Sequence, residues 1–293
     1  MSASFTIPNR ALTWLITGSS SGFGLSLVRK AQAHGHTVIA TSRNPSRTPE
    51  LVAEVKSKGG KWVKLDVDDL DSNRIIEDLE QQGQHIDILV NNAGFSIYNA
   101  VELFTEDEVR REMDTLYFGP SRLIRAVLPH MRKRRFGAIV NISSGASLEG
   151  RESMGAYAGA KAALDGMSKV LAKEVAPFNI RVLTVCPGTF NTNMGNATVL
   201  GKNPVPEDYK GSVADQTMQY MASGKFAADG DKDKAAKVIY EVTVGQGAGA
   251  GHENERFLPL GRDVAVRVKL VAEQLTHSWD VFGDAASNVY REK

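Results

Sequence analysis

The amino-acid sequence predicts an α/β protein with a doubly wound parallel sheet. Six short runs rich in Val and Ile recur along the chain, helix-like segments separate them, and the runs are apolar on both faces. Strands of this kind are buried between two layers of helices, as in a parallel sheet. The six expected strands are residues 12–17, 37–41, 62–65, 86–90, 138–142 and 180–185.

Length and composition favour one domain over residues 1–293. The chain is 42% hydrophobic and 24% charged, which is enough for one sizeable core.

The formal charge of +1 gives no general attraction to nucleic acid. A single cysteine, Cys186, fits a reducing compartment, and we expect no metal site. No apolar stretch approaches the roughly 18 residues that span a bilayer, and the N-terminus lacks a secretory pattern, so we expect a cytoplasmic protein.

The first strand leads directly into a glycine-rich turn, Thr17-Gly18-Ser19-Ser20-Ser21-Gly22-Phe23-Gly24, and a helical pattern follows over residues 25–34. This order of strand, turn and helix is typical of Rossmann-like dinucleotide sites. Glycines are needed there because the turn takes unusual backbone angles and the backbone must approach a pyrophosphate at the helix N-terminus. A tight turn that binds nothing is the alternative interpretation.

The end of the second strand bears on which dinucleotide is bound. An NAD site usually carries an acidic residue there for the ribose 2′-hydroxyl, whereas this strand ends in Ala40-Thr41-Ser42-Arg43-Asn44. The Ser42 hydroxyl and the Arg43 guanidinium are donors that suit the 2′-phosphate of NADP. Arg43 could instead be a solvated loop residue. The sequence favours NADP over NAD.

A long segment after Cys186, residues 193–228, mixes Gly, Pro and Asn with Met and aromatic residues, and we expect it to be a substrate lid. A helix over 232–244, a strand near 256–260 and a helix over 263–282 should follow. Residues 245–251 form a glycine-rich turn after a helix, which is not the context of a phosphate site. The expected division is a cofactor-binding core over 10–190, the lid over 193–228 and a C-terminal part over 229–293.

An apolar pocket wall is expected beneath this lid. Met and aromatic side chains in loops give an adaptable apolar surface, although several of them could only pack the lid against the body. The expected wall residues are Phe95, Ile97, Tyr98, Leu148, Met154, Met194, Met218, Tyr220, Met221 and Phe226.

Tyr157 and Lys161 are candidates for proton chemistry. In a helix expected over residues 154–177 they lie one turn apart on the same face. A nearby ammonium lowers the pKa of a tyrosine from its usual value of about 10, so Tyr157 could exchange a proton near neutral pH. Alone, such a pair is often accidental. The position of the pair among the other motifs indicates whether it is functional.

Together these motifs resemble the short-chain dehydrogenase/reductase family from about Leu12 to Gly261. The turn matches the family's Thr-Gly-x-x-x-Gly-x-Gly pattern at Thr17, Gly18, Gly22 and Gly24, with Ser20, Ser21 and Phe23 inside it. The resemblance implies that Asp66 contacts the adenine. It also implies that Asn91-Asn92-Ala93-Gly94 supports the sheet and borders the cofactor.

The resemblance extends to the catalytic residues. Ser144, thirteen residues before Tyr157, matches the catalytic serine, and Ser143 is the neighbouring candidate. Lys161 is implied to bind the nicotinamide ribose. The segment Pro187-Gly188-Thr189-Phe190-Asn191-Thr192 resembles the one that holds the nicotinamide carboxamide, through the backbone of Phe190 and the hydroxyl of Thr192. The implied activity is reduction of a ketone or aldehyde by NADPH in a homo-oligomer.

Within the family the chain is similar to the 17β-hydroxysteroid-dehydrogenase-like and retinol-dehydrogenase-like group. The similarity rests on Ser20-Ser21-Gly22-Phe23-Gly24, on residues 40–45 and on Leu258-Pro259-Leu260-Gly261. It implies a lipophilic carbonyl or alcohol as the substrate.

One departure concerns Leu116. The family commonly has Asn-x-x-Gly in the helix before the fifth strand, and this chain has Leu116-Tyr117-Phe118-Gly119. In the family the asparagine helps to hold a water that connects the lysine to solvent, and leucine cannot do so. Leu116 therefore leaves open a second interpretation, a cofactor-binding regulatory protein with impaired catalysis. A third interpretation, an NAD-dependent alcohol dehydrogenase, would require that Arg43 does not bind a 2′-phosphate.

Overall fold

A computed structural model describes residues 5–194, 199–224 and 227–291. Its centre is a sheet of seven strands in the order β3-β2-β1-β4-β6-β7-β9, and every neighbouring pair is parallel. This confirms the predicted doubly wound α/β fold. The strands are β1 (Thr13–Ile16), β2 (Thr37–Ser42), β3 (Lys61–Lys64), β4 (Ile88–Asn91), β6 (Gly137–Ile142), β7 (Ile180–Pro187) and β9 (Phe257–Leu260).

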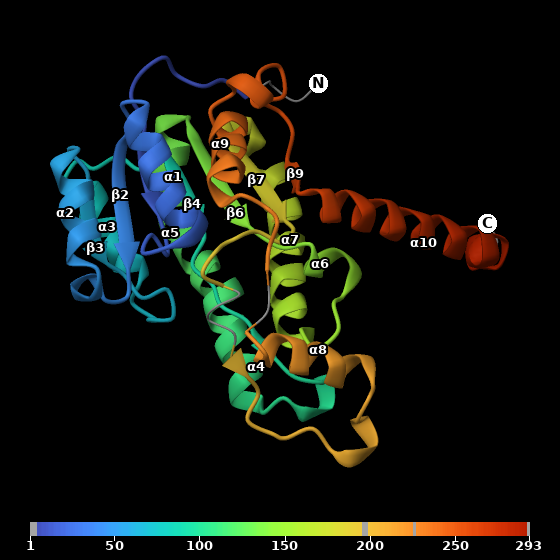
Figure 1. Cartoon of the computed structure of the whole chain (residues 1–293). Coiled ribbons are helices and arrows are strands. Elements are labelled where there is room, and N and C mark those ends of the chain that lie inside the picture. Colours follow the sequence, from blue (N-terminus) through green and yellow to red (C-terminus); the bar gives the residue numbers. More distant parts are fainter. Residues whose placement is uncertain (1–4, 195–198, 225–226, 292–293) are drawn as a thin grey trace.

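Helices cover both faces of the sheet and bury two separate cores (Figure 1). On one face lie α1 (Gly22–Ala33), α2 (Pro49–Ser57) and α9 (Lys232–Thr243). On the other lie α3 (Asn73–Gln81), α5 (Gly119–Arg134) and α7 (Gly155–Val175). The central strands are therefore apolar on both faces, which explains their uninterrupted Val and Ile runs.

The helical segment that precedes β6 is continuous but irregular. It consists of α4 (Glu106–Met113), a π-helical turn (Asp114–Phe118) and α5. Thr105 begins it with a capping box, in which its hydroxyl accepts from the Glu108 backbone and the Glu108 carboxylate accepts from Thr105. Leu116 lies in the π-helical turn and is fully buried.

The segment expected to be a lid contains regular structure. In its described part are β8 (Val199–Leu200), which pairs with β5 (Ile97–Tyr98), and α8 (Val213–Ala222). Met221 of α8 packs in one buried cluster with Leu116, Met154 and Tyr157. Short connections include α6 (Ala146–Glu149) and the 3₁₀ turns Pro45–Arg47, Val101–Leu103, Ala176–Phe178, Glu207–Tyr209 and Gly247–Gly249.

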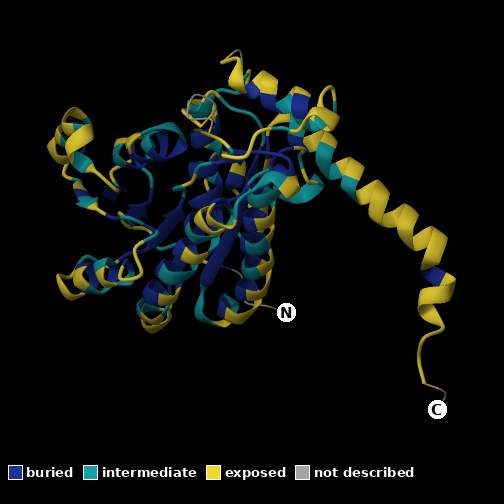
Figure 2. Ribbon diagram, turned by 90° about the horizontal axis from the view of Figure 1, so that it is seen from below, coloured by how far each residue is buried: buried dark blue, intermediate teal, exposed yellow. Residues whose placement is uncertain are grey.

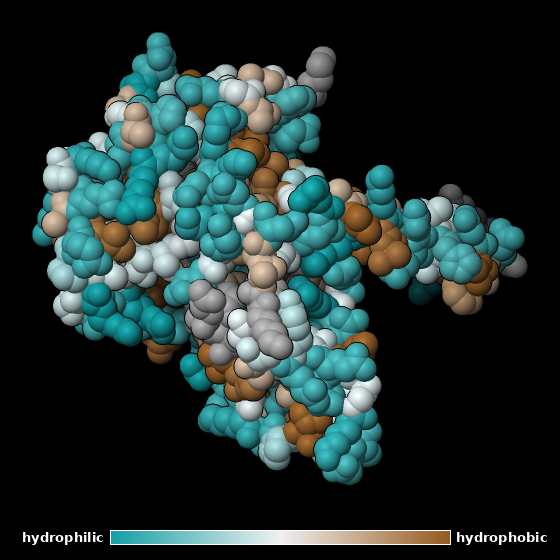
Figure 3. Space-filling model, viewed as in Figure 1, coloured by the Kyte–Doolittle hydropathy of each residue, from teal (hydrophilic) through white to brown (hydrophobic). Residues whose placement is uncertain are grey.

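The last helix, α10 (Arg262–Ser287), leaves the body and projects away from it (Figures 1 and 2). Val264 fixes its first turn and is fully buried, whereas Leu275, Trp279 and Phe282 are 68%, 63% and 66% exposed. Apolar side chains are visible along this helix in the space-filling view (Figure 3). Over the described residues, no helix is both long and apolar enough to cross a membrane.

Candidate active site

The carboxyl ends of the parallel strands meet at one edge of the sheet, and a cleft with a cavity volume of about 400 Å³ opens there. Such an edge is the usual ligand site of doubly wound sheets. Most of the predicted site residues line this cleft: Gly18, Ser20, Ser21, Gly22, Phe23, Ser42, Arg43, Asp66, Asn92, Ala93, Gly94, Ser144, Tyr157, Lys161, Pro187, Gly188, Phe190 and Thr192.

The glycine turn after β1 has the shape of a phosphate cradle. Gly18 and Gly22 have φ angles of +65° and +55°, which favour glycine. At Gly24 a Cβ atom would lie 2.4 Å from the Gly18 carbonyl oxygen, so no side chain fits. Ser21 makes no side-chain capping hydrogen bond at the N-terminus of α1. Backbone N–H groups of the first turn of α1 are therefore free to donate hydrogen bonds to an anion. The glycine turn thus fits a dinucleotide pyrophosphate.

Thr17 and Asn91, both predicted to bind the cofactor, do not line the cleft but support it. The Thr17 hydroxyl accepts hydrogen bonds from the backbone N–H groups of Asn92 at 2.9 Å and Ala93 at 3.0 Å. The Asn92 amide donates to the Thr17 carbonyl at 2.8 Å. Asn91 donates to Asn141 on the neighbouring strand at 2.8 Å. These bonds fix the glycine turn against β4.

The far end of the cleft carries the residues that bear on cofactor choice. Ser42 ends β2, and its hydroxyl accepts from the Trp62 indole at 3.0 Å. Arg43 is exposed, and among the described residues its guanidinium makes no hydrogen bond or ion pair. Asp66 accepts from the backbone N–H of Asp68 at 3.2 Å. An unpaired guanidinium beside a hydroxyl can bind a phosphate.

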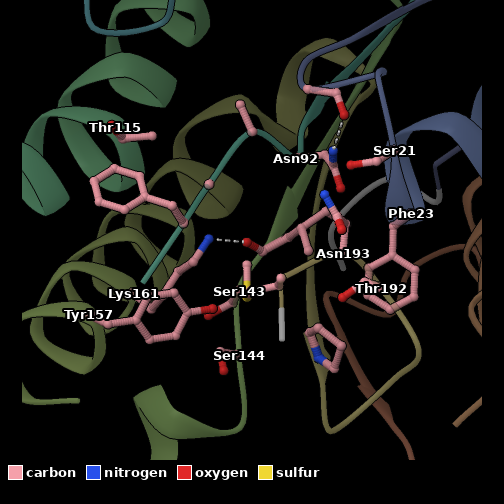
Figure 4. A pocket seen from close by; sticks show the side chains of 18 of the residues that line it. Ser21, Phe23, Asn92, Thr115, Ser143, Ser144, Tyr157, Lys161, Thr192 and Asn193 are labelled. Carbon is pink, nitrogen blue, oxygen red and sulfur yellow. Dashed lines mark hydrogen bonds between the residues drawn. The ribbon is translucent and has the colours of Figure 1, made fainter. Parts of the chain in front are cut away.

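At the other end, Tyr157 and Lys161 extend from α7 toward Ser143 and Ser144, which follow β6 (Figure 4). Both α7 side chains are buried, and the Lys161 Nζ lies 5.8 Å from the centre of the Tyr157 ring. The Lys161 ammonium donates to the Ile142 carbonyl at 2.6 Å. The three predicted catalytic residues thus line the same end of the cleft.

The two serines differ in their partners. Ser143 is 2% exposed, and its hydroxyl lies 3.3 Å from that of Ser147, which donates to the Asp165 carboxylate. The Ser144 hydroxyl accepts from the backbone N–H of Ala146 at 3.2 Å, and its hydrogen bond to Tyr157 stabilises the phenolate. This arrangement supports Ser144 rather than Ser143 as the partner of Tyr157.

The expectation that the pKa of Tyr157 falls below its usual value is wrong for this structure. Burial raises the pKa of Tyr157 above its usual range, and the hydrogen bond from Ser144 lowers it only in part. Burial also lowers the pKa of Lys161 to about 8, while Asp165 and Glu112 raise it. Desolvation is the largest cause of both pKa shifts because both side chains lie in the protein interior. Tyr157 therefore keeps its proton near neutral pH, as a proton donor must.

The pocket wall agrees in part with the expectation. Phe95, Tyr98, Met154 and Met194 line the cleft. The structure places Ile97, Leu148, Met218, Tyr220 and Met221 away from the lining, and Phe226 lies outside the described residues. Met218 and Met221 are buried because they pack α8 against the body.

Thr115, Arg151 and Asn193 are among the lining residues that the sequence did not predict. They belong to no motif, and only the folded chain brings them to the cleft. In the described ranges, no group of His, Cys, Asp and Glu side chains could hold a metal ion.

The model of the family described as short chain dehydrogenase matches residues 13–203. The chain belongs to the short-chain dehydrogenase/reductase family. It is 39% identical over 209 residues to oxidoreductase claN of Passalora fulva, covering 71% of this chain and 94% of that protein. It is 40% identical over 203 residues to 3-ketodihydrosphingosine reductase of Bacteroides thetaiotaomicron, covering 68% and 71%. Membership in this family makes the protein an oxidoreductase, and therefore an enzyme.

Solved structures of the family share the fold. A short-chain dehydrogenase from Streptomyces avermitilis is 33% identical with a TM-score of 0.85, covering 97% of this chain and 100% of that one. A serine dehydrogenase complexed with NADP⁺ is 26% identical with a TM-score of 0.69, covering 85% and 94%. A family member from Burkholderia phymatum in complex with NAD is 18% identical with a TM-score of 0.77, covering 93% and 97%, and shows the fold alone. Both dinucleotides thus occur on this fold.

Proposed function

We propose that the protein reduces a lipophilic ketone or aldehyde with NADPH, and that Tyr157 donates the proton. One observation carries the proposal: Tyr157, Lys161 and Ser144 meet at the end of the cleft that the apolar residues Tyr98 and Met154 also line. A carbonyl group that enters past these apolar residues would meet the phenol and the hydroxyl together.

Each residue has a separate task. When bound, NADPH supplies the hydride for the carbonyl carbon. Tyr157 gives its phenolic proton to the carbonyl oxygen, and Ser144 hydrogen-bonds that oxygen as negative charge develops on it. The Lys161 cation stabilises the phenolate that remains. The glycine turn after β1 would hold the pyrophosphate of the cofactor and the segment Pro187–Thr192 its nicotinamide, and together they would orient it.

Several findings support a lipophilic carbonyl compound as the substrate. Phe95, Tyr98, Met154 and Met194 give the cleft an apolar wall. Such walls bind apolar groups, while a few polar groups fix their orientation. One relative is named 3-ketodihydrosphingosine reductase, which is consistent with a ketone. Membership in the 17β-hydroxysteroid-dehydrogenase-like or retinol-dehydrogenase-like group stays a prediction.

The experiment that tests this function follows the oxidation of NADPH and of NADH with a panel of aliphatic, aromatic and steroid-like ketones and aldehydes. We expect NADPH oxidation with at least one apolar carbonyl compound. Binding of NADPH without turnover on the whole panel would favour a regulatory protein, the alternative that Leu116 motivates. A preference for NADH, with oxidation of alcohols, would favour the NAD-dependent dehydrogenase.

A further inference from the structure

A buried carboxyl group lies on α4, the helix that packs against α7 and its catalytic pair. Glu112, in the last turn of α4, is fully buried, and its Oε1 accepts from the Ile97 backbone N–H at 2.7 Å. Its Oε2 is also buried and has no hydrogen-bond partner among the described residues. A buried carboxylate oxygen without a partner is unfavourable, so this oxygen carries a proton or binds a buried water. Either state suits a group that exchanges protons.

Glu112 is placed where the family's proton route is interrupted. It precedes Leu116 by four residues, and both α4 and the π-helical turn pack against α7, which carries Tyr157 and Lys161. Leu116 and Lys161 meet over Gly94: a Cβ atom on that glycine would lie 2.9 Å from Leu116 Cδ2 and 4.0 Å from Lys161 Nζ. The leucine therefore occupies the neighbourhood of the ammonium where the family has its asparagine.

The charge of Glu112 acts on both catalytic groups. It raises the pKa of Lys161 and that of Tyr157. Burial raises the pKa of Glu112 itself to about 7. The charge of Glu108 contributes to this increase, whereas the hydrogen bond from Ile97 and the charges of Arg111 and Lys161 oppose it. The remaining titratable neighbour is Tyr98, whose pKa Glu112 also raises. A carboxyl group of this kind can exchange a proton with Lys161 near neutral pH.

We propose that Glu112 resupplies the proton to the Tyr157–Lys161 pair after each turnover, in place of the water route that Leu116 interrupts. The inference rests on the proposed reductase function. Glu112 acts through Lys161 and does not touch the substrate.

The proton balance of this relay is simple. Once Tyr157 has protonated the carbonyl oxygen, it is a phenolate. Lys161 gives the phenolate one proton and regains one from the Glu112 carboxyl group through a buried water, because the two side chains make no direct hydrogen bond. The net change is one proton moved from Glu112 to Tyr157. The Glu112 carboxylate then regains a proton from bulk water before the next cycle. None of these steps is an oxidation or a reduction.

Different results are expected if the role of Glu112 is purely structural. In that case Glu112 would only accept the Ile97 N–H and hold β5 in place. Glutamine keeps an acceptor oxygen and nearly the same shape but cannot give up a proton. Glu112→Gln therefore separates the two roles. Glu108→Gln is a matched control, because Glu108 is also a buried carboxylate of α4, and glutamine preserves its capping box.

The test compares steady-state and single-turnover rates of NADPH oxidation across pH, using the carbonyl substrate on which the wild-type protein is active. For the wild type we expect kcat to fall as the pH rises through about 7. For Glu112→Gln we expect that fall to disappear and kcat at low pH to drop roughly tenfold or more, with KM unchanged. Its single-turnover rate should stay near wild type, because Tyr157 begins the cycle protonated. Glu108→Gln should keep the low-pH kcat and the single-turnover rate of the wild type, and its fall in kcat should move to a lower pH, because the Glu108 charge raises the pKa of Glu112.

A double variant sharpens the test. Glu112→Gln with Leu116→Asn should regain a large part of kcat, because the asparagine reopens the water route. The inference is overturned if Glu112→Gln keeps the wild-type kcat and pH profile, or if it loses single-turnover and steady-state rates equally. The charges of Glu112 and Lys161 influence each other, so the fall of kcat with pH cannot be attributed to one group from the wild type alone. It is attributed to Glu112 from the difference between the wild type and Glu112→Gln. A wild-type protein without turnover would instead refute the proposed function.

Discussion

At the scale of single residues, Arg43 is the group that we expect to set cofactor preference. Arg43→Ala should weaken NADPH binding roughly tenfold to a hundredfold and leave NADH binding nearly unchanged, since only NADPH offers a phosphate to the guanidinium. Fluorescence titration gives both dissociation constants. Arg47→Ala is the control, because Arg47 is an exposed arginine in the adjoining 3₁₀ turn and does not line the cleft. Equal weakening of both cofactors by Arg43→Ala would contradict this assignment.

Glu112 should also affect stability in a pH-dependent way. Its pKa in the folded protein is raised from 4.5 to about 7, so between these pH values the folded state binds more protons than the unfolded state. Its contribution is therefore most favourable below about pH 4.5 and is lost as the pH rises through about 7. Glu112→Gln lacks this titration and should gain stability relative to the wild type on going from about pH 5 to pH 8, by about 3 kcal/mol at most.

Urea unfolding of both proteins at the two pH values measures this difference. A constant difference in the free energy of unfolding across pH would show that Glu112 titrates normally. Such a result would remove the electrostatic support for the relay.

At the scale of elements, the glycine turn after β1 should tolerate no added side chain at Gly24. Gly24→Ala places a Cβ atom against the Gly18 carbonyl and the Asn92 amide, so the turn must shift. We expect a lower melting temperature and loss of NADPH binding. In α7, a Cβ atom on the exposed Gly166 would meet nothing within 4 Å. Gly166→Ala should therefore be neutral or stabilise by about 0.5–1 kcal/mol. Similar effects of the two variants would contradict this explanation.

The elements differ in how far the sequence predicts them. The central strands are predictable because burial on both faces leaves uninterrupted apolar runs, as in β4 and β7. The helix α8 was not expected, because its segment is rich in loop-forming residues and its two buried methionines are fixed by packing against the body. The π-helical turn at Leu116 adds a residue to one turn, which the apolar pattern of a single sequence does not indicate.

The active site, too, is predictable from the sequence only in part. The positions of Ser144, Tyr157 and Lys161 follow from motif spacing, and all three line the cleft. The direction of the Tyr157 pKa shift does not follow from spacing, because it depends on how much water the folded chain excludes. Glu112 had no motif of its own. Only the folded chain reveals that its carboxyl group is buried beside the catalytic pair.

At the scale of the whole molecule, we propose a homo-oligomer that pairs through the long helices α4, α5 and α7. Phe118 and Val170 on this surface are 46% and 56% exposed. Light scattering should give the mass of a dimer or larger assembly, and Val170→Asp should reduce it. Leu275→Asp is the control, since Leu275 on the projecting α10 is 68% exposed. A monomeric wild type, or dissociation by Leu275→Asp alone, would contradict pairing through these helices.

The central claim is that Tyr157 is the proton donor of an NADPH-dependent carbonyl reductase. Its most direct test is kcat/KM of the wild type and of Tyr157→Phe for a carbonyl substrate, with NADPH affinity measured on both proteins. We predict that Tyr157→Phe binds NADPH like the wild type and loses at least about a hundredfold in kcat/KM. Turnover by Tyr157→Phe near the wild-type rate would contradict the account.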